Sequence, residues 1–371
     1  MSDPDFKARY GLRDVINAAG TFTPVGVSRS APHVADIASA ALRDHFIIEE
    51  LQQAAGGALA AWSGAEAGAV THCTAASITL AVAAAMCGDN GHAVAQLPDT
   101  AGLADKVVLP AGHAVNYGQP ITQAIRLSGA QVVLAGNEAE CPISALAEAL
   151  ARPGAACLLL VSSRLTRGAP VDLKAAITAA HEAGVPAIID AAAQDMRIAE
   201  LTALGADLIL ISAQKYLAAP TAGVVVGCRA HIDALRRQEK GIGRGMKASK
   251  EAICGVMAAI ETRQSLEPAA WRRQQAEKLD WLQPRLDGLP GVSAQIAEDP
   301  AGMPLSRLRL AIDPAEAGMD AAELSARLKA GSPSIWVIET YVAEGVLLLE
   351  LVPLEHEELE LIAEIFGALL G

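Results

Sequence analysis

A single lysine stands between two apolar stretches in residues 205–227, GADLILISAQKYLAAPTAGVVVG. Desolvating an ammonium group is costly, so lysine is among the residues least often fully buried. Lys215 follows the apolar run 208–212, which predicts a buried strand. Its side chain therefore either points into water where the strand ends, or lies in a cleft because its amine takes part in a reaction.

Two further polar features follow predicted strands. Asp190 ends the apolar run in AIIDAAAQ, and VTHCTAAS (residues 70–77) passes from a strand into a new helix. In doubly wound sheets, ligands bind beyond the carboxyl ends of the strands. The free N–H groups at the start of that helix, with the hydroxyls of Thr74 and Ser77 beside them, could hold a phosphate group.

An amine, a carboxylate and a phosphate-binding turn at neighbouring strand ends fit pyridoxal phosphate. Lys215 would form the Schiff base, and Asp190 would keep the pyridine nitrogen protonated so that the ring draws electrons from the substrate. Each feature has an ordinary alternative, because a strand-end aspartate often caps a helix. The order of the three features along one sheet edge favours the cofactor site.

The elements that must position these residues alternate along the first 230 residues. Apolar segments followed by helical stretches indicate a parallel sheet that is covered on both faces. The predicted strands are 68–71, 92–96, 106–109, 131–135, 157–162, 187–190, 208–212 and 223–227. The sequence therefore predicts an α/β fold with a mostly parallel sheet.

The pattern changes near residue 230. Charged helical stretches and further short strands follow, which indicates a second domain of α+β type. The predicted helices are 230–240, 250–267, 268–286, 320–330 and 354–370, and the predicted strands are 306–312, 335–340 and 346–351. We predict a large α/β domain over residues 1–235, of which residues 1–45 form an N-terminal arm, and a smaller C-terminal domain over residues 236–371.

Composition excludes several function classes. No apolar run reaches the roughly 18–20 residues that a membrane span requires. A formal net charge of −13 disfavours broad nucleic-acid binding, which requires a basic surface. The six cysteines form no CxxC pair and no HExxH motif occurs, so we expect reduced thiols and no metal site. The N-terminus lacks the apolar core of a signal peptide, and we expect a cytoplasmic protein.

Segments spread over nearly the whole chain resemble one enzyme family. They are INAAGTFTPVG (16–26), ELQQAAGGALAAWSGAEAGAVT (50–71), AHEAGVPAIIDAAAQ (180–194), residues 205–227 and GIGRGMKASKEAI (241–253). The chain resembles the family that holds D-glucosaminate-6-phosphate ammonia-lyase and, more distantly, selenocysteine synthase, which are fold-type-I pyridoxal-phosphate enzymes. The resemblance implies a seven-stranded type of sheet, pyridoxal 5'-phosphate as cofactor, and a homodimer or higher homo-oligomer. It also implies that Lys215 is the Schiff-base residue and that Asp190 partners the pyridine nitrogen.

Three parts of the sequence depart from the family pattern. Ala213 and Gln214 precede Lys215 where the family usually has a Gly-rich turn. The loop 71–76 reads Thr-His-Cys-Thr-Ala-Ala, where relatives often have Thr-Ser-Gly-Ala-Ala. Ile338 stands where relatives often carry an arginine that could bind a substrate anion. We therefore expect the cofactor chemistry to be retained, whereas the substrate stays open.

Further polar residues are candidates for the cofactor site. His72 and His113 could stack on the cofactor ring or act as acid or base, and the alternative for each is a solvated loop histidine. We predict His113 to be catalytic, and Tyr117 could reach the same cleft. Thr74, Ala75, Ser212 and His72 complete the predicted cofactor contacts.

Candidates for substrate binding come from three loops. Arg244 and Lys247 of the GIGRGMK loop could bind an anionic group, and the alternative is a solvated basic turn. Thr21 lies in the N-terminal segment that matches the family. Arg164 follows the predicted strand 157–162 and could bind a carboxylate.

The leading functional hypothesis is a lyase that acts on a small amino acid with a leaving group on the β-carbon. Lys215 would remove the α-proton, and β-elimination would end in a 2-oxo acid and ammonia. The same first step also supports a racemase, an aldolase, β-replacement or an aminotransferase. Selenium or sulfur transfer onto an aminoacyl-tRNA would require a basic surface, which the net charge argues against. A non-enzymatic binding protein would not need both Lys215 and Asp190.

Overall fold

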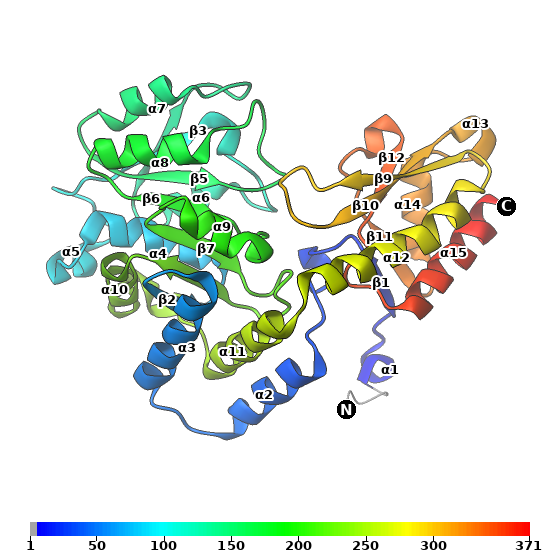
Figure 1. Cartoon of the computed structure of the whole chain (residues 1–371), viewed down its shortest axis with the longest axis horizontal. Helices are drawn as coiled ribbons and strands as arrows, with labels where there is room; N and C mark the ends of the chain where they lie inside the picture. The colour runs from blue at the N-terminus through cyan, green and yellow to red at the C-terminus, as the bar shows by residue number, and fades with distance from the viewer. Residues whose placement is uncertain (1–5) are drawn as a thin grey trace. The chain divides into compact units, whose positions relative to one another are not determined.

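Apolar strands of the larger part of the chain pair into one seven-stranded sheet (Figure 1). The computed structural model describes residues 6–371. The strand order is β2-β8-β7-β6-β5-β3-β4, and only β8 runs antiparallel to its neighbours. The bounds are β2 Ala67–Thr71, β3 Lys106–Pro110, β4 Gln131–Ala135, β5 Ala155–Val161, β6 Ala187–Asp190, β7 Leu208–Ser212 and β8 Gly223–Gly227. The predicted α/β fold with a mostly parallel sheet is confirmed.

One predicted strand is wrong. Residues 92–96 belong to the helix α5 (Gly91–Gln96). The side chain of Asn90 caps this helix by accepting hydrogen bonds from the backbone N–H groups of His92 and Ala93. Such a cap satisfies donors that a helix otherwise leaves free at its start, and it favours a helix over a strand.

Both faces of this sheet are covered by helices. Successive side chains of a strand point to opposite faces, so Leu158 and Leu160 pack in one core while Leu159 and Val161 pack in the other. The helices are α2 Pro32–Arg43, α3 Ile48–Ser63, α4 Thr74–Cys87, α5, α6 Ile121–Arg126, α7 Ile143–Leu150, α8 Leu173–Glu182, α9 Ile198–Ala203, α10 Arg229–Arg237 and α11 Lys250–Ser265. Burial on both faces explains why the strands read as continuous apolar runs.

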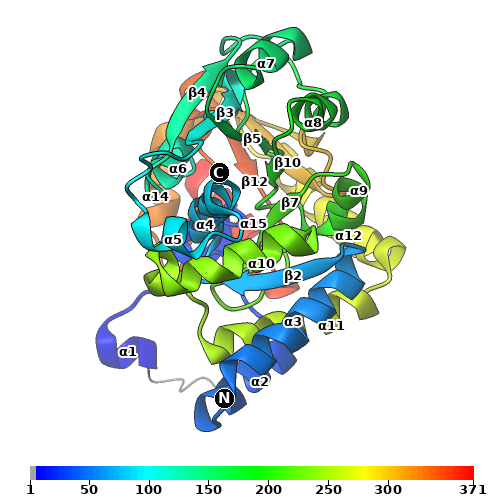
Figure 2. The same cartoon turned by 90° about the vertical axis from the view of Figure 1, so that its left-hand side faces the viewer.

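Backbone contacts divide the chain into two compact units that differ from the predicted domain ranges. The larger unit is residues 30–265, because α11 packs on α2 and α3 and so joins residues 236–265 to the α/β part (Figure 2). The smaller unit combines residues up to 29 with residues 266–371. Its two ends are joined because β1 (Val15–Ala18) pairs in parallel with β11 (Ser334–Val337).

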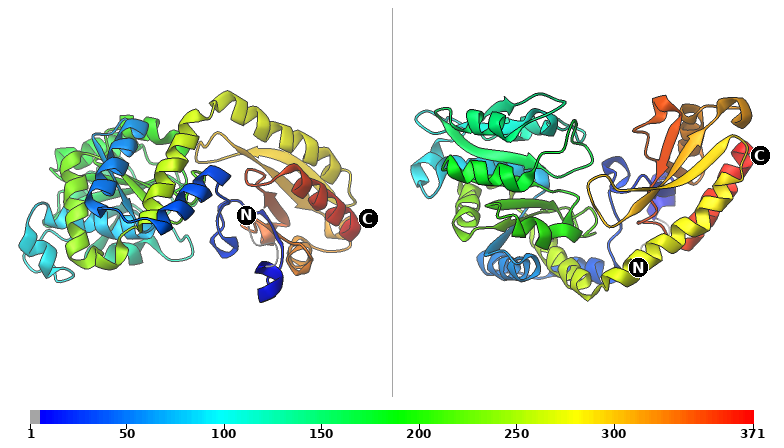
Figure 3. Two further views of the ribbon diagram at one scale, coloured as in Figure 1. Left: turned by 90° about the horizontal axis from the view of Figure 1, so that it is seen from below. Right: turned by 45° about the horizontal axis from the view of Figure 1, so that its top comes forward.

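The smaller unit contains an antiparallel sheet in the order β12-β10-β9. Its strands are β9 Val292–Glu298, β10 Ser306–Ile312 and β12 Val346–Leu349. The helices are α1 Phe6–Tyr10, α12 Pro268–Asp287, α13 Pro314–Ala317, α14 Ala321–Ala330 and α15 His356–Leu370. Helices α12 and α15 lie side by side (Figure 3). The sequence does not predict the strands β1 and β9. Polar residues occupy much of β9, because it forms an edge of its sheet, and so it lacks the apolar run that marks a buried strand.

Within residues 6–371, no helix has both the length and the apolar character that crossing a membrane requires.

Candidate active site

The strand directions gather most of the candidate residues at one edge of the seven-stranded sheet. Strands β2, β3, β5, β6 and β7 end at this edge, and the antiparallel β8 begins there. Thr71 and Ser212 both have Gly223 as their register partner. Asp190 pairs with Val161 of β5 on one side and with Leu210 of β7 on the other. The turn that carries Lys215 contains no glycine, and it begins directly after Ser212 at the same edge of the sheet.

That turn is held by backbone hydrogen bonds. The N–H of Lys215 donates to the carbonyl of Ser212 at 3.2 Å, and the N–H of Ala213 donates to Ala222 at 3.0 Å. Ala218 has a φ of 54°, in the left-handed region that costs a non-glycine residue roughly 1–2 kcal/mol. The Gln214 side chain accepts a hydrogen bond from Thr221 at 2.8 Å. The turn thus adopts a tight conformation without the glycines of the family pattern.

Asp190 is a buried carboxylate at the end of β6. Its Oδ1 accepts a hydrogen bond from the N–H of Ala192 at 3.1 Å. Burial raises the pKa of Asp190 above its ordinary value, while the charge of Lys215 and the Ala192 N–H oppose that rise. A cationic N–H in contact with this carboxylate would favour its ionised form. The protonated ring nitrogen of pyridoxal phosphate supplies such a group, so Asp190 fits this cofactor.

His113 lies in the turn after β3 and is buried, with 5% of its surface exposed. Its Nδ1 accepts a hydrogen bond from the N–H of Val161 at 3.0 Å, which leaves the ring proton on Nε2. Burial lowers the pKa of His113 to about 4. The ring is therefore neutral at physiological pH.

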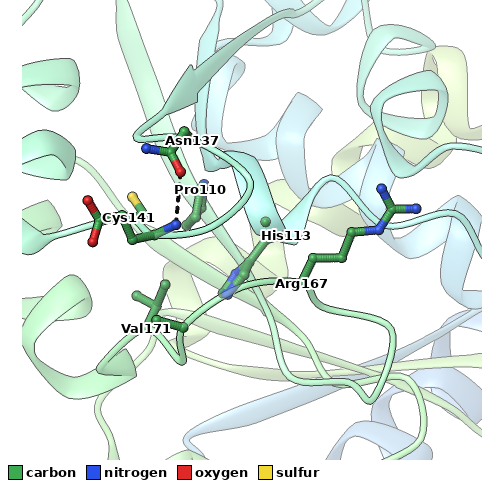
Figure 4. A pocket seen from close by; sticks show the side chains of 9 residues that line it. Pro110, His113, Asn137, Cys141, Arg167 and Val171 are labelled. Atoms are coloured by element: carbon green, nitrogen blue, oxygen red, sulfur yellow. Dashed lines mark hydrogen bonds between the residues drawn. The ribbon is translucent and has the colours of Figure 1, made fainter.

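His113 also lines a narrow surface pocket (Figure 4). Asn137 closes one side of this pocket by accepting a hydrogen bond from the N–H of Glu140 at 3.0 Å. The side chain of Arg167 extends away from the pocket (Figure 4). The pocket leaves no room for a water molecule. We therefore attribute it to the packing of the loops around His113.

The turn from β2 into α4 fits a phosphate group. Cys73 is the N-cap residue of α4, and its side chain makes no capping hydrogen bond. The hydroxyl of Thr74 is buried and has no hydrogen-bond partner among residues 6–371. Thr71 and Ser77 brace the turn through a 2.7 Å contact between their hydroxyl oxygens. An uncapped helix start beside a free hydroxyl can bind an anion such as the cofactor phosphate.

The basic loop lies against this turn. The N–H of His72 donates to the carbonyl of Met246 at 2.9 Å, and Thr71 forms an isolated antiparallel bridge with Lys247. These contacts bring the backbone of Lys247 beside the start of α4. Arg244 is exposed in the preceding turn, and the His72 side chain is exposed as well.

The other candidates are placed less closely. Ala75 lies in the first turn of α4, and Arg164 is exposed in the loop after β5. Thr21 belongs to the smaller unit, in a loop closed by a 2.7 Å hydrogen bond from the Asn17 side chain to Gly20. Ile338, where relatives often carry an arginine, also belongs to the smaller unit and is buried.

The sequence does not predict Asp195 or Arg263 as site residues, and for Tyr117 it indicates only that this residue could reach the same cleft as His113. Burial raises the pKa of Tyr117 to about 12, and the nearby charge of Asp190 adds to that rise. Tyr117 therefore lies close to Asp190 with its hydroxyl protonated. Asp195 and Arg263 form a buried ion pair, with 2.8 Å between the carboxylate and guanidinium atoms. No local motif signals this pair, because its members are far apart in the sequence.

Known proteins share this architecture, and two of them are identical to this chain at about a third of the aligned positions. Residues 70–305 match the family described as Aminotransferase class-V. The chain belongs to the class-V aminotransferase family. It is 32% identical to D-glucosaminate-6-phosphate ammonia lyase of Salmonella typhimurium (strain 14028s / SGSC 2262), over 94% of this chain and 93% of the relative.

Two solved structures and a second relative extend this class-V comparison. A structure of D-glucosaminate-6-phosphate ammonia-lyase matches with a TM-score of 0.87 and 31% identity, over 99% of this chain and 98% of that one. A 5'-C-glycyluridine monooxygenase-decarboxylase from Streptomyces sp is 37% identical over 88% of this chain and 82% of its own length. A serine palmitoyltransferase of Sphingomonas wittichii, 15% identical over 95% of this chain and 86% of that one, shares the fold with a TM-score of 0.59. The chain is a pyridoxal-phosphate enzyme of fold type I.

Proposed function

We propose that this enzyme is an ammonia-lyase that eliminates a β-substituent from an amino acid. The observation that carries the proposal is that the end of β6, with the buried Asp190, and the turn after β7, with Lys215, follow paired strands at the sheet edge where an uncapped α4 can hold a phosphate. The similarity to D-glucosaminate-6-phosphate ammonia lyase over 94% of the chain supports the elimination. Pyridoxal phosphate, when bound, stabilises negative charge at the α-carbon of an amino acid.

Lys215 has two tasks in this proposal. Its Nζ would hold the cofactor between turnovers, and its free amine would take the α-proton of the bound substrate. Loss of the group on the β-carbon then follows with its bonding electron pair, and a proton converts a departing hydroxyl into water. Hydrolysis of the remaining enamine yields a 2-oxo acid and ammonia.

The neighbouring groups hold charges and protons. The Asp190 carboxylate would hold the proton on the pyridine nitrogen in place. His113 presents a neutral ring, because its pKa is lowered to about 4. The α4 N-terminus and the Thr74 hydroxyl would bind the phosphate, and Lys247, whose backbone pairs with Thr71, would add a positive charge there.

Cationic residues in two loops of the larger unit support a proposal for the substrate class. Arg244, Lys247 and Arg164 come from loops of the larger unit and could bind a carboxylate or a second anionic group. The Salmonella relative is named for a phosphorylated amino-sugar acid. We therefore propose a β-hydroxy amino acid with an additional anionic group, rather than only a small neutral amino acid.

A second candidate function is an oxidative decarboxylation. The similarity to the 5'-C-glycyluridine monooxygenase-decarboxylase, at 37% identity, favours it. Such a reaction would consume oxygen and release carbon dioxide from the substrate carboxylate. The same Lys215 and Asp190 would serve it, since both reactions begin by stabilising charge at the α-carbon.

One assay separates these two functions. The purified enzyme is incubated with a panel of β-hydroxy amino acids, D-glucosaminate-6-phosphate and 5'-C-glycyluridine, and four quantities are measured: ammonia, 2-oxo acid, carbon dioxide and oxygen uptake. The lyase proposal predicts equal amounts of ammonia and 2-oxo acid with no oxygen uptake. Oxygen uptake matched by carbon dioxide would replace it with the second candidate. Turnover with neither signature would reject both.

We further propose that the protein is at least a homodimer. Five large apolar side chains are exposed along the segment from α2 into α3, namely Ile37, Leu42, Phe46, Ile47 and Ile48. Ile47 is 64% exposed, and exposed apolar clusters of this kind mark protein interfaces. A second copy of the chain would cover them.

Replacing Ile47 with aspartate should therefore separate the subunits, because it places a charge where apolar surface is buried. Light scattering after gel filtration should give about half the wild-type mass, as expected when a two-fold interface is lost. Leu127→Asp changes a residue of similar exposure on another surface and serves as the control. A monomeric wild type, or an unchanged mass of the Ile47 variant, would contradict this interface.

We also propose that the enzyme works in a reducing compartment such as the cytoplasm. All six cysteines are free thiols, and Cys87 and Cys157 are buried. Burial raises the pKa of Cys157 to about 12, which makes this thiol unreactive. Alkylation of freshly lysed cells followed by mass spectrometry should find these thiols reduced, and a disulfide would contradict the assignment.

A further inference from the structure

Arg263 bridges two turns that follow neighbouring strands. Its guanidinium lies 2.8 Å from the carboxylate of Asp195, which follows β6. The same guanidinium donates a hydrogen bond to the carbonyl of Tyr216, which follows β7. Asp195 comes five residues after Asp190, and Tyr216 comes directly after Lys215. One side chain on α11 therefore connects the two segments that carry the proposed cofactor residues.

The bridge is built inside the protein. The side chain of Asp195 is 1% exposed and that of Arg263 is 14% exposed. Burial raises the pKa of Asp195, and the Arg263 charge opposes that rise. A guanidinium presents several donors in a rigid plane, so it can bind a carboxylate and a carbonyl at once, with a fixed angle between them. This geometry suits a residue that sets the distance between two loops.

We propose that Arg263 is a positioning residue that, together with Asp195, holds the Lys215 turn in register with Asp190. This inference rests on the proposed roles of Lys215 and Asp190 in cofactor binding. The Lys215 turn has a reason to need such support, because Ala218 holds a left-handed conformation that an alanine resists. Without the bond to the Tyr216 carbonyl, the turn can relax and carry the Lys215 amine away from Asp190.

The alternative is that Arg263 only neutralises a buried carboxylate. The two roles separate in a pair of variants, Arg263→Met and the double variant Arg263→Met with Asp195→Leu. The single variant leaves Asp195 buried without its cation, which destabilises the protein in either case. The double variant removes that charge, so its melting temperature as apoprotein should return close to the wild-type value. The bond to the Tyr216 carbonyl stays absent in both.

Three readouts are measured on the full-length protein. They are the dissociation constant for pyridoxal phosphate, the visible circular dichroism of the bound cofactor, and hydrogen exchange of the amides of residues 213–219 in the apoprotein. We expect the double variant to bind pyridoxal phosphate about tenfold more weakly or worse, the size expected for one lost charge-assisted hydrogen bond. The dichroism should change and the amide exchange should speed up. Arg263→Lys, which keeps the charge but not the planar fork, should fall between.

The control is Arg229→Met, which removes a hydrogen bond of 2.7 Å from an arginine to the carbonyl of Glu66 at the opposite edge of the same sheet. It should leave the three readouts at their wild-type values. Recovery of both melting temperature and cofactor affinity in the double variant would overturn the proposal in favour of charge neutralisation. If the wild type itself binds no pyridoxal phosphate, the proposed function fails. The amide exchange of residues 213–219 then still decides whether Arg263 positions the turn.

Discussion

Lys215→Ala should abolish the visible absorption of the lysine-bound cofactor and lower kcat/KM by about 10⁴-fold or more, the order seen when a residue that acts both as covalent group and base is removed. Alanine can neither bond to pyridoxal phosphate nor take the α-proton. The wild-type enzyme is reduced with borohydride in parallel, which fixes the cofactor on the lysine it occupies. Peptide mapping should then find the modification on the segment that contains Lys215.

The matched control for this variant is Lys174→Ala. Lys174 is exposed on α8 and donates a hydrogen bond to the carbonyl of Leu204, away from the sheet edge that carries Lys215. Its replacement should preserve both the absorption and the activity. The assignment of Lys215 would be rejected if the reduced cofactor were found on another lysine, Lys247 included, or if Lys215→Ala kept its visible absorption.

Asp190→Asn should lower kcat on the order of 10²- to 10³-fold, the size that loss of one preorganised electrostatic partner has in other enzymes. Asparagine fills the same space and can still accept the hydrogen bond from Ala192, but it cannot stabilise a protonated pyridine nitrogen. We therefore expect the cofactor to bind while the electron-withdrawing power of its ring falls. Steady-state kinetics and the cofactor dissociation constant, measured on the same samples, check this result.

The same variant has an opposite effect on the stability of the apoprotein. Burial raises the pKa of Asp190 in the folded state above the ordinary value of 3.8, so the folded state binds this proton more tightly than the unfolded state does. The free energy of unfolding therefore falls as the pH rises from the ordinary pKa through the raised one. Asp190→Asn removes this dependence, and its apoprotein should be at least as stable as wild type at neutral pH.

Chemical or thermal unfolding of both apoproteins over a range of pH tests this sign. A variant that is less stable than wild type at neutral pH would contradict this prediction. It would show that the Asp190 carboxylate stabilises the fold through the charge of Lys215. A variant that is more stable but much less active would show that the protein retains the Asp190 carboxylate for the reaction, at a cost in stability.

Several strands are predictable from the sequence because consecutive apolar residues mark them. The strands 131–135, 187–190, 208–212 and 223–227 have the predicted bounds in the structure. The last three are buried on both faces, so a mostly apolar run marks each of them. Residues 131–135 form an edge strand in which Leu134 is exposed, and the consecutive valines and leucine mark it instead. The helix α5 was misread as a strand, because the deciding contact is the cap made by Asn90, which is polar and lies outside the apolar run.

The chemistry-bearing residues were also marked by local pattern. Lys215 and Asp190 each follow an apolar strand, and polar residues at strand ends point to a ligand site in a parallel sheet. What the sequence by itself determined is therefore the α/β fold and the pyridoxal-phosphate class, and it also predicts the two residues to which we assign the cofactor. These depend on strand ends and on segments of consecutive residues.

Only the tertiary structure decided which distant residues meet these two. Arg263 reaches Asp195 and Tyr216 because α11 packs on the larger unit, and residues up to 29 join the C-terminal segment because β1 pairs with β11. The neutral state of His113 is another such result, since it requires burial and the Val161 N–H. These properties arise from contacts between segments far apart in the chain, and no local pattern of residue types encodes a long-range contact.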